Sequence, residues 1–167
     1  MTQLALLGGT PVREKPWPRW PTWDDAERHR LDQVLESGEW GGFSEQVSEF
    51  EQAFARRHKA SHCIAAANGT LTLEAALRVA GVGPGDEVIV PPYTFIATAN
   101  AVRMAGATPV FVDVEPDTYN LDAQRVREAV QPACKAMIPV HFAGQLADMD
   151  ALMTLADEFG LFVIEDA

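Results

Sequence analysis

The sequence has little cysteine, no excess of basic residues and no long hydrophobic run, and each absence excludes a class of protein. Two cysteines, Cys63 and Cys134, are too few for a disulfide framework and lack the spacing of a metal knuckle, so no metal site is expected. The formal net charge of -11 leaves no basic footprint for nucleic acid or an anionic membrane. No stretch approaches the length of a membrane span and the opening residues lack a basic signal-peptide region, so we expect a cytoplasmic protein.

The common nucleotide-binding signatures are also missing. There is no GxGxxG and no GxxxxGK[ST], so neither a dinucleotide fold nor a P-loop is indicated. What is present is a composition of 47% hydrophobic and 22% charged residues, which is typical of a globular protein with a real core.

Residues 8–23 differ from the rest because they are rich in proline and tryptophan. Proline at this density favours an extended arm, and the tryptophans indicate that the arm packs against its own core or against a partner subunit. We therefore divide the chain into an arm, residues 1–23, and a domain, residues 24–167.

The domain begins with two predicted helices and then alternates strand and helix, which predicts an α/β fold with a mostly parallel sheet and helices on both faces. The expected helices are 24–37, 44–59, 71–80, 94–105, 122–130 and 148–159. The expected strands are 63–67, 87–91, 109–114, 136–141 and 161–166.

A candidate anion site lies between the first predicted strand and its helix, at Asn68, Gly69 and Thr70. The first amides of a helix have no intrahelical acceptor, and with the Thr70 hydroxyl they suit a phosphate group. The alternative is that these residues only turn the chain and cap the helix.

Aromatic and imidazole side chains follow two later strands. Tyr93 and Phe95 come after Pro91 and Pro92, and could cover a flat ligand or belong to the core; from the residues alone, the core is the simpler interpretation. His141 ends another strand, where a hydrogen-bonded structural role is more common than a catalytic one.

The last strand ends in two carboxylates, Glu165 and Asp166. They point to opposite faces because strand side chains alternate, so only one is expected at the ligand edge. A phosphate cradle, an aromatic plate and a carboxylate together suit a flat ligand with a phosphate and a basic ring nitrogen. Pyridoxal 5'-phosphate (PLP) is such a ligand.

Four long segments carry a resemblance to a known family: GVGPGDEVIVPPYTFIATANAV, GATPVFVDVEPDTYNLD, AMIPVHFAGQLADMDAL and LFVIEDA. Over about residues 16 to 167 the chain resembles the DegT/DnrJ/EryC1/StrS family of fold-type-I, PLP-dependent aminotransferases, which act on keto-sugars and cyclitols and include 3-amino-5-hydroxybenzoate synthases. The resemblance implies part of the family's large, PLP-binding domain, a homodimer, and transfer of an amino group from an amino acid such as Glu or Gln to a keto-sugar or cyclitol ketone.

The resemblance also implies roles for particular residues. Gly69 and Thr70, with the backbone at Leu71, match phosphate binders, and Phe95 matches the aromatic residue that stacks on the cofactor ring. Asp166 matches the catalytic aspartate that pairs with the pyridine nitrogen, and Glu165 becomes a structural residue.

The lysine to which the family attaches its cofactor has no counterpart here, since it belongs to a later serine-rich loop. Lys15, Lys59 and Lys135 lie in the arm, at a helix end and at the opposite edge of the sheet. We therefore expect an N-terminal portion of a family member, inactive by itself and prone to associate through exposed strand edges. Two alternatives stay open: a non-catalytic binding module of the same fold, and a sugar dehydratase that uses the aminated cofactor.

Overall fold

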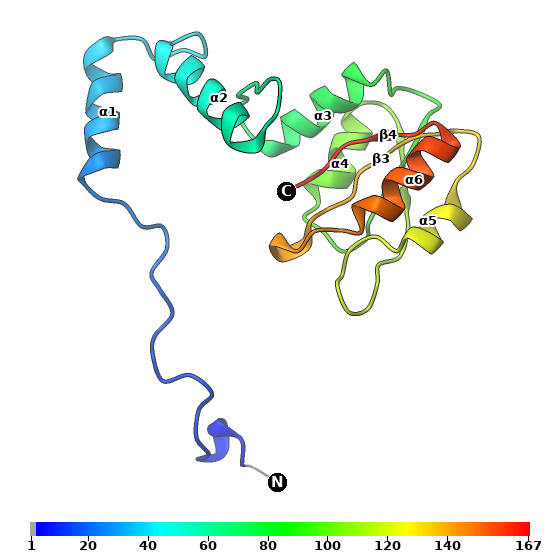
Figure 1. Ribbon diagram of the computed structural model, residues 1–167, viewed down its shortest axis with the longest axis horizontal. Helices are drawn as coiled ribbons and strands as arrows, with labels where there is room; N and C mark the ends of the chain where they lie inside the picture. The colour runs from blue at the N-terminus through cyan, green and yellow to red at the C-terminus, as the bar shows by residue number, and fades with distance from the viewer. Residues whose placement is uncertain (1–2) are drawn as a thin grey trace. The chain divides into compact units, whose positions relative to one another are not determined.

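The computed structural model describes residues 3–167, which fall into two compact units divided between Ile64 and Ala65. The first unit contains a 3-10 helix, η1 (Ala5–Leu7), and two α-helices, α1 (Asp25–Ser37) and α2 (Glu45–His58) (Figure 1). The residues between η1 and α1 form no helix or strand, in keeping with the proline-rich sequence there.

Local signals at both ends set the bounds of α1. The Asp24 carboxylate accepts a hydrogen bond from the Ala26 amide at 2.7 Å, and the Asp24 amide donates to the Glu27 carboxylate at 2.7 Å. This reciprocal pair satisfies two of the free amides at the start of the helix. Gly38, with a φ of 70°, ends the helix in the left-handed region that favours glycine.

The second unit is a parallel sheet with helices packed against both faces. Its strands stand in the order β2-β1-β3-β4, and all three pairings are parallel. The strands are β1 (Glu87–Val90), β2 (Thr108–Phe111), β3 (Cys134–Met137) and β4 (Phe162–Val163). The helices are α3 (Gly69–Val79), α4 (Ala97–Met104), α5 (Ala123–Ala129), α6 (Met149–Phe159) and a 3-10 turn, η2 (Phe142–Gly144). In the part of the chain from residue 3 onward, no helix is long and apolar enough to cross a bilayer.

Alternating strand residues divide the core into two layers. Val88 and Val90 of β1 pack with buried residues of α3 and α4, whereas Ile89 packs with those of α5 and α6. The same alternation separates Ala136 from Met137 in β3. Figure 1 shows α5 and α6 lying side by side, as their contacts require. Strands buried on both faces explain the continuous apolar runs in the sequence.

The prediction of a strand over residues 63–67 is wrong. The four-stranded sheet of the described residues does not include this segment, and the side chain of Ile64 is 83% exposed. An apolar run shows which side chains favour burial, but a strand also needs a paired neighbour. The other four predicted strands form, although each is shorter than expected by sequence.

Lys135 lies at the amino edge of the sheet, as predicted. Its ammonium group donates to the Gly81 carbonyl at 2.6 Å and lies 3.5 Å from the Asp86 carboxylate, in the turn that precedes β1. The side chains discussed next follow the carboxyl ends of the strands, where ligands bind in open α/β folds.

Candidate functional site

A cavity of about 450 Å³ opens at the carboxyl edge of the sheet, entirely within the second unit. It brings together residues from four separate stretches of the chain: the start of α3, the turn into α4, the segment after β3 and the segment after β4. Its lining includes Gly69, Thr70, Phe95, Thr98, His141 and Asp166. Four of the five residues predicted to bind a cofactor therefore share one cavity, and Leu71 does not line it.

The start of α3 presents amide groups to this cavity. Asn68 is the N-cap, and its side-chain oxygen accepts from the Leu71 amide at 3.1 Å. Gly69 and Thr70, which precede Leu71, have no intrahelical acceptor for their amides. The space where a Gly69 Cβ would point contains no atom within 4 Å. The Leu71 amide is therefore already used by the cap, and the amides of Gly69 and Thr70 are the ones at this helix start that could hold an anion.

Phe95 lies outside the buried core. Its ring is 77% exposed and lines the cavity, so the interpretation of Phe95 as a core residue is wrong. Tyr93 is also half exposed, and its ring packs against Tyr119 and Phe142, with centroids 5.5 and 4.7 Å away. Pro91 ends β1 and turns the chain across the sheet edge, which places both aromatics outside the two core layers.

Asp166 is held by its backbone in a parallel bridge to Val140, three residues after the end of β3. Its amide donates to the Pro139 carbonyl at 2.9 Å, and its carbonyl accepts from the His141 amide at 3.0 Å. Its carboxylate Oδ2 accepts from the Thr98 hydroxyl at 2.7 Å. Asp166 thus lines the cavity, as the sequence predicts, with one carboxylate oxygen engaged by the protein.

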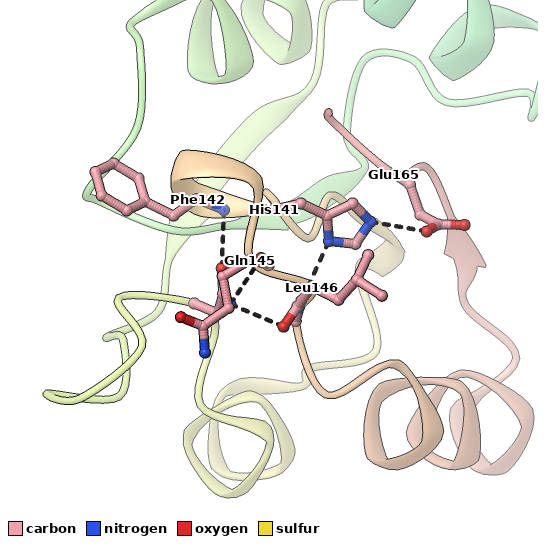
Figure 2. A network of polar contacts seen from close by, with 7 residues as sticks. His141, Phe142, Gln145, Leu146 and Glu165 are labelled. Carbon is pink, nitrogen blue, oxygen red and sulfur yellow. Dashed lines mark hydrogen bonds and ion pairs between the residues drawn. The ribbon is translucent and has the colours of Figure 1, made fainter. Parts of the chain in front are cut away.

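Glu165 faces the other way, and its partner is His141. The imidazole Nδ1 accepts from the Ala147 amide at 3.2 Å, so the ring proton must be on Nε2, which lies 2.8 Å from Glu165 Oε2. Figure 2 shows this ring between the two contacts. The structure confirms that Glu165 and Asp166 have separate surroundings, and that His141 is hydrogen-bonded at both ring nitrogens.

Sequence reasoning missed Asn120, which fixes the segment after β3. Asn120 is 2% exposed; its Nδ2 donates to the carbonyls of Gln145 and Leu146 at 3.2 and 3.1 Å. Its Oδ1 accepts from the Phe142 amide at 3.0 Å. Figure 2 shows these contacts drawing the turn of Phe142, Gln145 and Leu146 together beside His141. One buried side chain thereby shapes the cavity wall that Phe142 contributes.

Replacing Asn120 by alanine is expected to lower the free energy of unfolding by about 2–3 kcal/mol, because buried backbone groups would lose their partners. Urea unfolding of the variant and the parent protein measures the difference. Asn100→Ala, an exposed asparagine in α4, is the matched control and should change stability by less than about 0.5 kcal/mol. Equal stability of the two variants would show that the Asn120 contacts contribute nothing.

The ionisable groups with clearly shifted pKa values lie outside the cavity lining. Burial raises the pKa of the Cys134 thiol, which sits at the amino end of β3 beside Glu87. A hydrogen-bonded pair between Arg127 and Glu158, at 2.6 Å, raises the pKa of the guanidinium and lowers that of the carboxyl. These groups connect elements of the fold and take no part in the site.

Comparison with known proteins identifies the family. The sequence profile of the "DegT/DnrJ/EryC1/StrS aminotransferase family" matches residues 21–167. The chain is 49% identical over 160 residues to 3-amino-5-hydroxybenzoate synthase of Amycolatopsis mediterranei (strain S699), covering 93% of this chain and 41% of that protein. It is 44% identical over 171 residues to L-glutamine:2-deoxy-scyllo-inosose aminotransferase of Streptomyces kanamyceticus, covering 99% of this chain and 40% of that protein.

Solved structures agree in fold. The crystal structure of 3-amino-5-hydroxybenzoic acid synthase aligns with a TM-score of 0.88 and 48% identity, over 91% of this chain and 40% of that one. NtdA of Bacillus subtilis, solved with bound cofactor PMP, aligns with a TM-score of 0.83 and 35% identity, over 87% of this chain and 34% of that one.

These matches confirm the predicted fold class, a partial fold-type-I PLP-transferase domain, and the chain spans about 40% of the length of the curated relatives it matches. The extent of the profile match, with identities near one half, makes this chain a member of the DegT/DnrJ/EryC1/StrS aminotransferase family.

Proposed function

We propose that this chain is the cofactor-binding part of a PLP-dependent aminotransferase. The enzyme would move an amino group from glutamine or glutamate to the ketone of a sugar or cyclitol. The observation that carries the proposal is the meeting of Gly69, Thr70, Phe95 and Asp166 at one cavity. The named activities of the relatives support the substrate class, because the Streptomyces kanamyceticus protein takes its amino group from L-glutamine.

The residues of the cavity fit PLP by their chemistry. The Gly69 and Thr70 amides, with the Thr70 hydroxyl, would hold the phosphate at the positive end of α3. Phe95, exposed to the cavity, would cover one face of the ring. Asp166 would keep a proton on the ring nitrogen, where the cofactor supplies its electron-withdrawing chemistry.

Each residue of this chain then has a simple task. Phe95 keeps water from one face of the ring, and the α3 start anchors one end of the ligand while Asp166 anchors the other. Anchoring at both ends fixes the orientation of the ring between them, which is the protein's main contribution in a cofactor enzyme. We also propose a homodimer in the cytoplasm, by analogy with the family alone.

The phosphate cradle can be tested by comparing PLP with pyridoxal, which lacks the phosphate. We expect the protein, expressed at its full natural length, to bind PLP at least tenfold more tightly than pyridoxal, since a charge-assisted hydrogen bond to the phosphate contributes about 1.5–3 kcal/mol. Thr70→Val removes one donor and should reduce the preference for PLP by about tenfold in a fluorescence titration.

The control for this titration is Thr154→Val. The Thr154 hydroxyl donates to the Asp150 carbonyl on α6, away from the cavity, so its loss should leave both affinities unchanged. Equal binding of PLP and pyridoxal by the unaltered protein would refute a phosphate site at α3.

A further inference from the structure

Thr98 is a buried hydroxyl to which neither the sequence nor the family profile gives a role. It lies in the first turn of α4, is 1% exposed, and is one of few buried polar side chains in the described chain. Its Oγ1 lies 2.7 Å from Asp166 Oδ2 and 3.0 Å from Thr94 Oγ1. Thr98 therefore connects α4 to the carboxylate that lines the cavity.

The number of protons on each hydroxyl decides which group donates in these two contacts. A hydroxyl has one proton, and Thr98 donates it to Asp166 Oδ2. In its contact with Thr94, Thr98 must then accept, so Thr94 donates. The two threonines form a directed chain, Thr94 to Thr98 to Asp166, in which each hydroxyl strengthens the next as a donor.

The backbone of Asp166 is already fixed, so the two threonine hydroxyls control the orientation of its side chain. The amide and carbonyl of Asp166 are bonded to Pro139 and His141, which leaves the two side-chain torsions. The Thr98 hydroxyl fixes the carboxylate through Oδ2. Within residues 3–167, Oδ1 has no hydrogen-bond partner, and it is the oxygen left for a ligand.

We propose that Thr98, supported by Thr94, is a positioning residue that orients Asp166 so that Oδ1 accepts from a protonated ring nitrogen. The inference rests on the proposed function, since the ligand is the pyridinium ring of PLP. It adds that the contact with the ring nitrogen depends on α4 as well as on the segment after β4. In this proposal Thr98 acts on the ligand through its hydrogen bond to Asp166.

The test compares PLP with its 1-deaza analogue, in which a carbon replaces the ring nitrogen. The ratio of the two affinities isolates the contact to Asp166, because phosphate and ring-face contacts are common to both ligands. In the protein at its full natural length, Thr98→Val is expected to reduce the preference for PLP by about tenfold, the effect of one charge-assisted hydrogen bond. Affinity for the deaza analogue should stay within about twofold, because that ligand makes no use of Asp166.

Three further variants make the result specific. Thr98→Ser keeps the hydroxyl and should restore the preference for PLP. Thr94→Val removes only the outer hydroxyl, and should reduce the preference by about threefold, a smaller effect since Thr98 can still donate. Thr154→Val, a hydroxyl deletion on α6, should change nothing.

The two proposals fail in different ways. If the unaltered protein does not prefer PLP to the deaza analogue, the proposed role of Asp166 fails, and the role of Thr98 with it. If the unaltered protein shows the preference and Thr98→Val or Thr94→Val keeps it in full, only the positioning role is overturned. A thermal melt of each variant identifies any that does not fold, in which case the Thr94→Val result decides.

Discussion

Replacing Asp166 by alanine is expected to weaken PLP binding by at least about thirtyfold, because removing one member of a desolvated charge pair costs 2–5 kcal/mol. Asp166 lines the cavity with its backbone fixed by Pro139 and His141, so no other carboxylate can take its place without moving the strand. Fluorescence titration of the protein at its full natural length measures the affinity. Binding within about threefold of the parent protein would show that Asp166 does not contact the ring nitrogen.

Two further variants separate charge from structure. Asp166→Asn keeps an oxygen that can accept from Thr98, so stability should be nearly unchanged while PLP affinity falls as in the alanine variant. Glu165→Gln removes the neighbouring charge instead. Because its amide oxygen can still accept from His141 Nε2, this variant should bind PLP as the parent protein does. Loss of PLP binding in Glu165→Gln would show that Glu165, and not only Asp166, is needed for binding, contrary to our proposal.

The parts of the fold that local pattern controls were predictable. Apolar runs at β1 and β3 reflect burial on both faces, and caps at Asp24, Asp148 and Gly160 set helix ends through contacts within four residues. The strand predicted at 63–67 failed because pairing is not local: a sequence shows apolarity, and no property of the segment itself supplies a neighbour.

The candidate site also contains residues that the sequence could predict and residues that it could not. Gly69, Thr70 and Asp166 follow strand or turn signals, so the rule that ligands bind at the carboxyl edge made them candidates from the residues alone, whereas the role of Phe95 came from the family resemblance. The reduced role of Leu71 depends on which way the Asn68 side chain turns, which the sequence does not show.

Thr98 and Asn120 were missed for a physical reason. The partner of Thr98 lies 68 residues away in sequence, and those of Asn120 are backbone groups 22 to 26 residues away. Neither contact follows a periodicity or a motif, since each joins groups that are far apart in the sequence. The signal that could have pointed to Asn120 is its place in a short polar turn, where asparagine commonly bonds nearby backbone.

Replacing Leu77 by alanine is expected to lower the free energy of unfolding by about 2–5 kcal/mol, the range for a buried leucine that leaves a cavity. Leu77 is 0% exposed and belongs to the core layer that α3 and α4 share with β1. Urea unfolding measures the loss. Val79→Ala, two residues along the same helix with a side chain 90% exposed, is the control and should cost less than about 0.5 kcal/mol. Comparable losses in the two variants would mean that α3 is not anchored by this layer.

The same variant connects the core to the site, since α3 carries the proposed phosphate cradle at its start. A ligand that binds only the native state stabilises it by about 2.7 kcal/mol at a concentration one hundred times its dissociation constant. PLP should therefore recover much of the stability that Leu77→Ala loses, and should raise the free energy of unfolding of Val79→Ala by the same amount. Pyridoxal at the same concentration should recover less, because it cannot use the Gly69 and Thr70 amides. If PLP stabilises Val79→Ala but not Leu77→Ala, the cavity left by Leu77 must have displaced the start of α3, and the cradle depends on core packing as well as on its own residues.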